Sequence, residues 1–447
     1  MASAHAVAVV GGACAGSVVA AHLAERGCRV VVFEQNVRPY GKIEDGLPRW
    51  HNKQREMEYR KIDERLDRAG IEFVPKVRFG EEIGLEGLLD DWGFNALVLA
   101  NGAWKDRDLA VPGAIESLGK GLIYQNEFVY WFNHFHEEGY DGPQFEIVDE
   151  ALCVGGGLAS IDVIKIIQLE LYGRALRARG IDVDVYDLEH KGIPKVCAAH
   201  GIDDPQSLGV RGATLVYRRR VEDMPLASAG PDASEKIKAR LPTTRRKILE
   251  KAQSKFLFRV MTQRVTKSVL LEDGRLAGLE LLETKLSDGR VRPVEGSEHE
   301  LRSPLVISSI GSIPEPLQGV QMKGAYYEFK DWDTGEYAPR SGVFGAGNVV
   351  TGQGNIKASM EHGKFVAGHL AEIYLGLREG DLSEGTARGE AKATATGEAV
   401  SEHLASVPQR TPAELDTISQ RVRELQRARG YSVYADWIAA NTPKVAE

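Results

Sequence analysis

The chain has 447 residues, too many for one ordinary hydrophobic core, so its length predicts two domains. Its composition of 43% hydrophobic and 27% charged residues is typical of a soluble globular protein, and its net charge of −8 argues against non-specific binding to nucleic acids. No apolar run reaches the ~18–20 residues that span a membrane, and the first strand starts too early to leave room for a signal peptide, so we expect a cytoplasmic protein.

Short apolar runs alternate with helical patterns, first near the N-terminus and again after Ala151. Such alternation implies parallel sheets. The expected strands lie at residues 6–10, 29–33, 71–74, 96–100, 214–217, 256–260, 277–283 and 305–310. The expected helices lie at residues 15–26, 51–69 and 161–171. Residues 174–212 form a long connection that we expect to hold extra helical turns, and residues 342–372 return to a glycine-rich motif followed by a helix.

The C-terminal part of the chain has a composition of its own. Residues 384–410 are rich in Ala, Thr, Gly and Glu and indicate a linker. Thr411, Pro412 and Glu414 then predict the capping box of a helix. The apolar stripe of this helix consists of Leu415, Ile418, Val422 and Leu425. We expect the stripe to dock on the protein's own body, with binding to a partner as the alternative.

The cysteines are not arranged as redox pairs or metal-binding pairs: they are Cys14, Cys28, Cys153 and Cys197. Without a Cys-x-x-Cys pair, the sequence argues against a thiol–disulfide reductase and against a cysteine-ligated iron–sulfur cluster. Cys197 and His200 have a spacing found in metal sites, but no second half accompanies them. We therefore expect no metal site.

A first nucleotide-binding fingerprint follows the strand at 6–10, with Gly11, Ala13 and Gly16 at its glycine positions. Small residues at such a strand–helix turn let the backbone approach a pyrophosphate, and the helix N-terminus supplies amide donors. Glu34 ends the next strand, where an acidic side chain accepts hydrogen bonds from both hydroxyls of an adenosine ribose and repels a 2′-phosphate. The first site therefore favours FAD or NAD over NADP.

Two later turns favour FAD at this first site. They lie at Asn101-Gly102 and at Gly347-Asn348. Asn348 is placed to hydrogen-bond a ribityl hydroxyl of the flavin. Backbone amides between Gly354 and Ile356, at the start of the next helix, are placed to stabilise negative charge on a reduced flavin ring.

A second fingerprint follows Ala151, with Gly155, Gly157 and Ser160 at its three positions. Here the next strand ends in Arg218 and Arg219, where the first site has a glutamate. Arginine grips the 2′-phosphate of NADP bidentately, so the second site is predicted to bind NADPH rather than NADH. The alternative is a solvated basic run at the end of a strand.

The motifs together predict an α/β fold with two Rossmann-like dinucleotide-binding domains. We expect an FAD-binding domain at residues 1–110 and 325–375, with an NADPH-binding domain inserted at residues 111–324. Residues 376–447 are expected to form a linker and a C-terminal helical tail.

These motifs resemble those of the adrenodoxin-reductase-like ferredoxin–NADP reductases and of the NADPH-oxidising small subunit of bacterial glutamate synthase. The resemblance covers residues 5–375. Residues 217–219, followed by the stretch from Glu222 to Pro225, are similar to the glutamate-synthase type, in which this stretch belongs to the NADPH site. Residues 131–133 and the long connection at 174–212 are more similar to the adrenodoxin-reductase type.

The resemblance implies FAD in the first domain, NADPH in the inserted domain, and one-electron delivery to an iron–sulfur partner. It also implies that His51, which follows Gly46 at the family's spacing, and Asp162 form a polar link near the flavin and nicotinamide rings. The alternative for His51 is a surface residue at the start of a helix. The chain departs from the family at Ala13, which replaces a glycine, and at Asn348, where the two family types have Asp or Trp.

The sequence thus predicts an FAD-dependent NADPH oxidoreductase that passes electrons to an external acceptor such as a ferredoxin. One alternative is the electron-input subunit of a larger oxidoreductase, and another is a flavin- and NADPH-binding redox sensor without turnover. A basic cluster after the second site is a possible surface for an acidic ferredoxin, or else a solvated helical face. It consists of Lys236, Lys238, Arg240, Arg245, Arg246 and Lys247.

Overall fold

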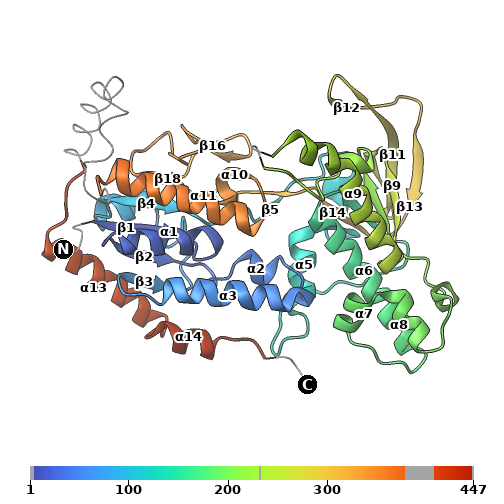
Figure 1. The fold of residues 1–447 in the computed structure, drawn as a ribbon, viewed down its shortest axis with the longest axis horizontal. Coiled ribbons are helices and arrows are strands. Elements are labelled where there is room, and N and C mark those ends of the chain that lie inside the picture. Colours follow the sequence, from blue (N-terminus) through green and yellow to red (C-terminus); the bar gives the residue numbers. More distant parts are fainter. Residues whose placement is uncertain (1–4, 231–232, 378–406, 445–447) are drawn as a thin grey trace. The chain divides into compact units, whose positions relative to one another are not determined.

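The computed structural model describes residues 5–230, 233–377 and 407–444 (Figure 1). The predicted linker is therefore outside the described residues from 384 to 406. The described chain divides into two compact units. Unit 1 contains residues up to Glu44, residues Asn52–Lys105, and the chain from Ser312 onward. Unit 2 contains Asp45–His51 and Asp106–Gly311.

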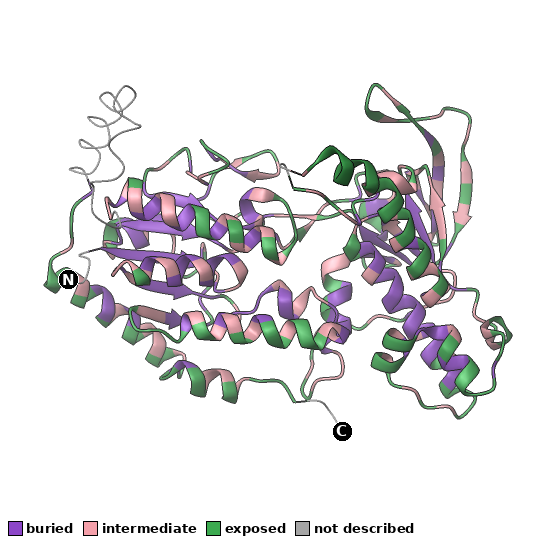
Figure 2. Cartoon of the chain, viewed as in Figure 1, coloured by how far each residue is buried: buried purple, intermediate pink, exposed green. Residues whose placement is uncertain are grey.

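Unit 1 is built on a five-stranded parallel sheet with the order β18-β4-β1-β2-β3. Its strands are β1 (Ala6–Val10), β2 (Arg29–Phe33), β3 (Ile71–Val74), β4 (Ala96–Leu99) and β18 (Val343–Gly345). Apart from Arg29 of β2 and the first two residues of β3, the residues of these strands are buried, as expected where both faces of a parallel sheet are covered (Figure 2). Because β2 and β4 flank β1 on opposite sides, the carboxyl end of β1 is a topological switch point, where ligands bind in such sheets.

Helices cover one face of this sheet. The core on this face joins Val7 and Val9 of β1 to side chains of three helices, Val19, Ile62 and Val366. The helices and turns of unit 1 before the tail are α1 (Cys14–Glu25), α2 (Lys42–Asp45), α3 (Asn52–Leu66), η2 (Gly87–Asp91), α10 (Asn348–Thr351), α11 (Ile356–His369) and η5 (Leu370–Tyr374). Figure 1 shows α11 beside α1, and the two helices pack closely.

Loops and short strands cover the opposite face of the unit 1 sheet. The core on this side joins Phe33 and Leu99 of the sheet to Phe94 and Tyr327. The short strands of this unit are β16 (Met322–Lys323) and β17 (Tyr326–Tyr327), with β15 (Ser312–Ile313) at the point where the chain re-enters unit 1.

The C-terminal tail crosses the outer edge of the sheet at β3. It consists of α13 (Pro412–Ala428) and α14 (Tyr434–Ala440). Ile418 and Val422 of α13 are fully buried in the core on the loop-covered face, whereas Tyr434 of α14 joins the core on the helix-covered face. The predicted capping box at Thr411 is present, and the prediction that the stripe docks on the protein's own body is confirmed.

Unit 2 contains a second five-stranded parallel sheet, with the order β6-β14-β7-β8-β9. Its strands are β6 (Leu122–Tyr124), β7 (Leu152–Gly155), β8 (Thr214–Tyr217), β9 (Arg259–Thr262) and β14 (Val306–Ser309). Its helices are η1 (Arg49–His51), α4 (Ala114–Ser117), α5 (Gln125–His134), α6 (Leu158–Arg177), α7 (Val185–Lys191), α8 (Ile193–Ala199), η3 (Pro205–Leu208), η4 (Val221–Asp223) and α9 (Glu235–Phe256). The long connection after α6 holds α7, α8 and η3, as expected.

A separate antiparallel sheet in unit 2 was not predicted as such. It contains β10 (Arg264–Glu272), β11 (Arg275–Ser287), β12 (Arg290–Pro293) and β13 (His299–Arg302). The two-residue strand β5 (Lys105–Asp106) lies where the chain passes from unit 1 into unit 2. The predicted strand at 277–283 is the middle of β11, whereas the strand predicted at 256–260 is present as β9 but begins later, at Arg259. Phe256 is the buried last residue of α9, and β9 begins at Arg259. The predicted start was too early because a short apolar run does not distinguish a strand from the buried end of a helix.

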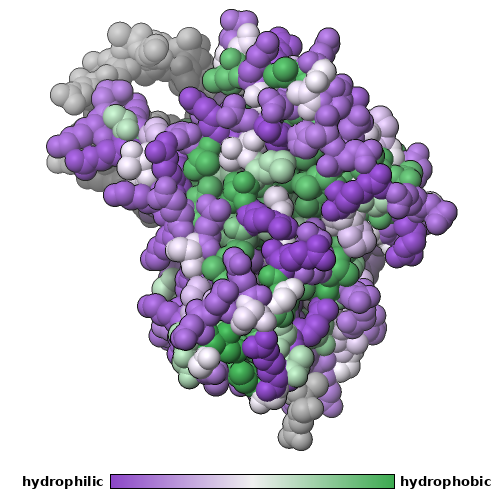
Figure 3. Space-filling model, turned by 90° about the vertical axis from the view of Figure 1, so that its right-hand side faces the viewer, coloured by the Kyte–Doolittle hydropathy of each residue, from purple (hydrophilic) through white to green (hydrophobic). Residues whose placement is uncertain are grey.

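The predicted fold class, two Rossmann-like α/β units with a C-terminal helical tail, is confirmed. Among the described residues no helix combines the length and the apolar character needed to cross a bilayer. On the face shown in Figure 3, hydrophobic side chains lie interspersed among hydrophilic ones, as is usual for a protein surface in water.

Gly363 and Gly368 test the packing of α11 on α1, because only one of them faces a neighbouring backbone. A Cβ on Gly363 would lie 2.9 Å from the carbonyl oxygen of Ala15, whereas a Cβ on Gly368 would meet nothing within 4 Å. We expect Gly363→Ala to lower the free energy of unfolding by about 1–3 kcal/mol through overpacking. Gly368→Ala should raise it by about 0.5–1 kcal/mol, because alanine is the better helix former. Denaturant unfolding measures both, and equal effects would contradict the packing.

Candidate dinucleotide-binding sites

The first fingerprint forms a turn between β1 and α1 that only small residues fit. Gly11 has φ of +95°, and a Cβ there would lie 2.7 Å from the carbonyl oxygen of Ala100. A Cβ on Gly16 would overlap the carbonyl oxygen of Gly11. Ala13 precedes α1 and no side chain caps this helix, so the amides of its first turn are available to an anion. The methyl group of Ala13 is accommodated because it faces Gly41, where a Cβ would lie 3.0 Å from it.

Glu34 lies at the carboxyl end of β2 and is tied to the fingerprint. Its side chain accepts hydrogen bonds from the backbone amides of Gly12, at 2.8 Å, and Asn36, at 3.0 Å. The residue is buried, with 4% of its surface exposed. A carboxylate has about four acceptor positions, more than the two that these amides occupy. Its fixed negative charge disfavours a phosphate at this position.

Two asparagines near the same sheet edge have buried oxygen atoms that lack a partner. Asn101 Nδ2 donates to the Tyr327 hydroxyl at 2.9 Å, but no hydrogen bond reaches Asn101 Oδ1 or Asn348 Oδ1 within the described residues. A buried acceptor left unpaired costs about 1–3 kcal/mol. Both atoms therefore fit a ligand that carries hydroxyl groups, as the ribityl chain of FAD does.

The remaining predicted residues of the first site lie in turns around α10 and α11. Gly102 and Gly347 have positive φ, and Gly354 and Ile356 flank Asn355, which caps α11 through the amide of Ala358. Sequence analysis missed His362 on α11. Its Nδ1 accepts a hydrogen bond from the amide of Gly347 at 3.0 Å, and burial lowers the pKa of its imidazole. No pattern in the sequence links His362 to this turn.

The second fingerprint repeats the same turn between β7 and α6. A Cβ on Gly155 would overlap the carbonyl oxygen of Ser309, and one on Gly156 would overlap the Tyr217 ring. Gly157 precedes α6, which no side chain caps, and a Cβ there would approach only Pro225, at 3.9 Å. The Ser160 hydroxyl donates to the carbonyl oxygen of Ser309 at 3.0 Å and holds α6 close to β14. The turn is thus closely packed at Gly155 and Gly156 and open at Gly157, as a pyrophosphate site requires.

The arginines after β8 have different environments. Arg220 pairs with Asp223 at 3.0 Å, whereas the side chains of Arg218 and Arg219 form no hydrogen bond or ion pair within the residues that the structure describes. Glu222, which the family resemblance placed at the NADPH site, forms an ion pair with Arg246, and this hydrogen bond lowers the pKa of its carboxyl. Arg218 and Arg219 remain available for a phosphate.

The predicted catalytic pair lies within unit 2, because the segment Asp45–His51 belongs to that unit. His51 Nε2 lies 3.8 Å from Asp162 Oδ1, which is longer than a hydrogen bond. His51 Nε2 is buried and has no hydrogen-bond partner among the described residues. The structure therefore brings the two side chains together as facing groups without a direct hydrogen bond.

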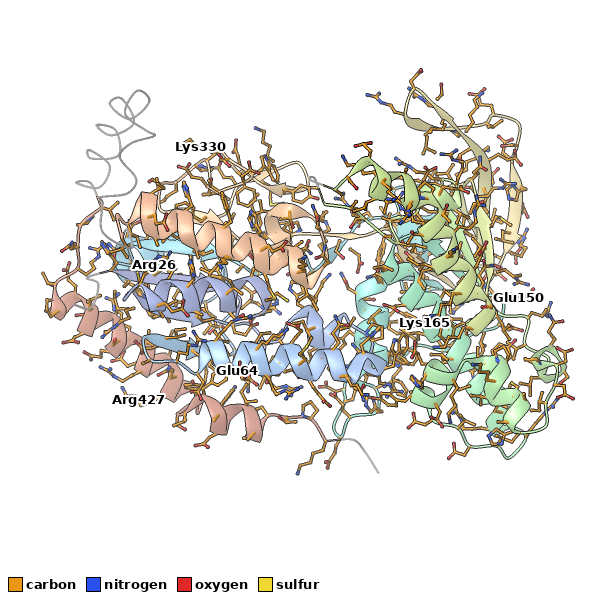
Figure 4. The ribbon with its side chains drawn as sticks, viewed as in Figure 1. Arg26, Glu64, Glu150, Lys165, Lys330 and Arg427 are labelled. Atoms are coloured by element: carbon orange, nitrogen blue, oxygen red, sulfur yellow. The ribbon has the colours of Figure 1, made fainter. Side chains whose placement is uncertain are left out.

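Lys165 is a member of this cluster that sequence analysis missed. Its ammonium lies 3.4 Å from Asp162 Oδ1 and 2.9 Å from Glu189 of α7 (Figure 4). It also lies 4.5 Å from the ring centroid of Trp50, the residue before His51, which is within the range of a cation–π contact. Its place three residues after Asp162 on a helix was the available signal.

Helix α5 fastens the segment that carries His51. Asn133 accepts from the amide of Arg49 at 2.9 Å and donates to the carbonyl oxygen of Leu47 at 3.1 Å. His134 bonds Asp45 at 3.0 Å and Glu137 at 2.9 Å through its two ring nitrogens. Burial alone would lower the pKa of His134, but the hydrogen bonds to the two carboxylates outweigh it, and the pKa is raised.

The raised pKa of His134 gives a prediction about pH. The stabilisation by the charged imidazole is fully present below the unfolded pKa of about 6.5 and is lost as pH rises through the raised pKa of the folded protein. We expect His134→Leu to cost about 2 kcal/mol at pH 6 and less at pH 9. Thermal unfolding across this range measures the difference, with His190→Gln on exposed α7 as control. A cost that does not change with pH would contradict the assignment.

The model of the NAD(P)-binding Rossmann-like domain family matches residues 9–52, which include the first fingerprint and Glu34. The NADPH glutamate synthase small chain of Mycobacterium tuberculosis is 27% identical over 388 residues, covering 83% of this chain and 67% of that protein. The mitochondrial NADPH:adrenodoxin oxidoreductase of Arabidopsis thaliana is 28% identical over 144 residues, covering 32% of this chain and 29% of that protein.

Among solved structures, Mycobacterium tuberculosis FprA in complex with NADPH matches with a TM-score of 0.67 and 17% identity, covering 95% of this chain and 90% of FprA. This likeness shows a shared fold. The resemblance predicted from the motifs is confirmed: the chain is similar to a glutamate synthase small chain and to NADPH:adrenodoxin oxidoreductase, and it shares the fold of FprA.

Proposed function

We propose that this chain passes electrons from NADPH, through FAD, to an external one-electron iron–sulfur acceptor such as a ferredoxin. The predicted enzyme class, an NADPH oxidoreductase, and the predicted cofactors, FAD and NADPH, are supported by the comparisons. The roles of individual residues and the nature of the acceptor are the proposal.

The observation that carries the proposal is the opposite charge at two equivalent places. In each unit the strand next to the fingerprint strand ends beside the turn, with Glu34 in unit 1 and Arg218 and Arg219 in unit 2. Glu34 accepts from ribose hydroxyls and repels a 2′-phosphate, whereas the arginines bind that phosphate. This pattern supports FAD in unit 1 and NADPH in unit 2.

In unit 1, the uncapped first turn of α1 would bind the pyrophosphate of FAD, and Asn101 and Asn348 would direct its ribityl chain through their free oxygen atoms. In unit 2, the first turn of α6 would bind the pyrophosphate of NADPH. When bound, FAD accepts a hydride and releases its two electrons one at a time. His51 and Asp162 would hold a proton and a compensating charge near the reacting rings, with Asp162 oriented by Lys165.

The proposal of an external acceptor rests on the cysteines and the metal-binding side chains of the described residues. None of the four cysteines forms a disulfide in the structure, and three of them are buried. Among the described residues no group of three or more His, Cys, Asp or Glu side chains could hold a metal ion. Electrons on a flavin in this chain therefore need a separate acceptor.

The second candidate is the electron-input subunit of a larger oxidoreductase. It is favoured by the similarity to a glutamate synthase small chain over 83% of this chain. The tail helix α13 does not support it, because its apolar stripe is buried on unit 1 and is not exposed to a partner subunit. Co-purification with a larger protein would favour this candidate over the ferredoxin reductase.

Anaerobic mixing with NADPH or NADH, followed by flavin absorbance, tests the cofactor assignment. We expect fast flavin reduction by NADPH only. In the double variant Arg218→Ala and Arg219→Ala, the Kd for NADPH should rise about 10- to 100-fold, because charge-assisted hydrogen bonds to the phosphate are lost. The Kd for NADH should not change. Arg220→Ala is the control, since Arg220 is occupied by Asp223, and an equal effect of this control would refute the assignment.

Internal contacts occupy Arg245 and Arg246 of the basic cluster on α9, so fewer of its side chains remain for a partner. Arg245 donates to the carbonyl oxygens of Glu222, at 2.8 Å, and Ala227, at 3.0 Å, and Arg246 pairs with Glu222. These arginines hold the loop after β8 and are unsuited to a docking test. The exposed cations that share one face of α9 by helical spacing are Lys236, Arg240, Lys247 and Lys251.

Charge reversal on this face tests docking of an acidic ferredoxin. We expect Arg240→Glu with Lys247→Glu to raise the KM for ferredoxin about tenfold at low salt, with a smaller effect at high salt, because surface charges are screened. Flavin reduction by NADPH should keep its rate. The matched control reverses Arg423 and Arg427, which are exposed on α13; Figure 4 labels Arg427. If both double variants behave alike, α9 is not the docking face.

A further inference from the structure

The loop of residues 35–41 lies directly against the first fingerprint. It follows Glu34, whose carboxylate accepts from the amides of Gly12 and Asn36. A Cβ on Gly12 would come within 2.8 Å of the Pro39 side chain, and the loop ends at Gly41, which faces Ala13. Since loop and fingerprint are in van der Waals contact, a shift of the loop moves the backbone that faces the pyrophosphate and ribose.

Two residues of the C-terminal tail hold this loop: Trp437 contacts it directly, and Tyr434 is linked to it through Asp63 of α3. Trp437 Nε1 donates to the carbonyl oxygen of Val37 at 2.7 Å, across 400 positions of sequence. Tyr434 donates its hydroxyl to Asp63 Oδ1 at 2.8 Å. The same carboxylate accepts from the hydroxyl of Tyr40, in the loop, at 3.1 Å. Burial raises the pKa of both tyrosines, so both phenols stay protonated and act as donors.

The tail is itself well anchored next to these contacts. Tyr434 packs edge-on against Phe73 of β3, with ring centroids 5.3 Å apart. Gln426 of α13 donates to the carbonyl oxygen of Phe73 at 2.9 Å, which satisfies a group on the edge strand. Lys76 lies 5.6 Å from the ring centroid of Trp437. The tail is therefore anchored on β3 and on Asp63 of α3, and these anchors fix the place at which it holds the loop.

We propose that Tyr434 and Trp437 are positioning residues of the first dinucleotide site, so that docking of the tail and retention of FAD stabilise each other. The proposal rests on the assignment of FAD to unit 1. Neither residue needs to touch the cofactor, because each acts through residues 37–40. By thermodynamic linkage, if the docked tail strengthens FAD binding, bound FAD must strengthen tail docking by the same factor.

The first measurement is the dissociation of FAD from the full chain. Tyr434→Phe with Trp437→Phe keeps an aromatic ring at each position, a smaller one at 437, and removes both hydrogen-bond donors. We expect FAD to dissociate about tenfold faster from this variant, as the loss of two ordinary hydrogen bonds allows. Tyr431→Phe is the matched control: Tyr431 is equally buried on the same tail, but its hydroxyl makes no hydrogen bond within the described residues. Its FAD dissociation rate should equal that of the wild-type protein.

The second measurement separates positioning from general stability. We expect FAD to slow amide hydrogen exchange of residues 434–440 in the wild-type protein and to do so much less in the double variant. The affinity of unit 2 for 2′,5′-ADP should be equal in all variants and reports that the chain is folded. Equal FAD dissociation in the double variant and the Tyr431→Phe control, or tail exchange that FAD does not change, would overturn the inference. A wild-type chain that binds no FAD would instead overturn the proposed function.

Discussion

The strand-to-helix turns leave no room for a side chain, and both candidate sites depend on this constraint. A Cβ on Gly16 would overlap the carbonyl oxygen of Gly11, and a Cβ on Gly155 would overlap that of Ser309. These are contacts with backbone, so a neighbour cannot relieve them by changing rotamer. They place the first turns of α1 and α6, which no side chain caps, at the carboxyl ends of β1 and β7. Each unit thereby presents amide donors and the positive end of a helix dipole to a ligand.

In the function proposed here, the residue at the end of the neighbouring strand gives the same backbone two specificities. Glu34 is buried and held by two amides, so its charge has a fixed position and would repel a phosphate bound beside it. Arg218 is exposed and Arg219 is half-buried, and their side chains are free to close around a phosphate. A rigid anion suits discrimination against a phosphate, whereas flexible cations with several donors suit its capture.

The features that sequence predicted are those fixed by local rules. Glycine positions in a turn, the charge after a strand and the capping box at Thr411 each depend on a few adjacent residues, and the structure contains all three. Contacts between distant residues were not predictable: Lys165 beside Asp162 and Trp50, and His362 beside Gly347, leave no periodic pattern. The strand predicted at 256–260 exists as β9, but its start was placed too early for the opposite reason, because the local apolar run begins at Phe256, the buried end of α9.

His51 shows why the long-range contacts matter for the proposed chemistry. The segment Asp45–His51 belongs to unit 2, although the residues before and after it belong to unit 1. Asn133 and His134 of α5 hold this segment, and Lys165 contacts both Trp50 and Asp162. The distance between His51 and Asp162 is therefore set inside one compact unit. Groups held in place before the reaction need no reorganisation when charge develops, which is how a fixed arrangement of charges lowers a barrier. In this chain that arrangement is maintained by α5 and α6 rather than by the single turn of η1, on which His51 lies.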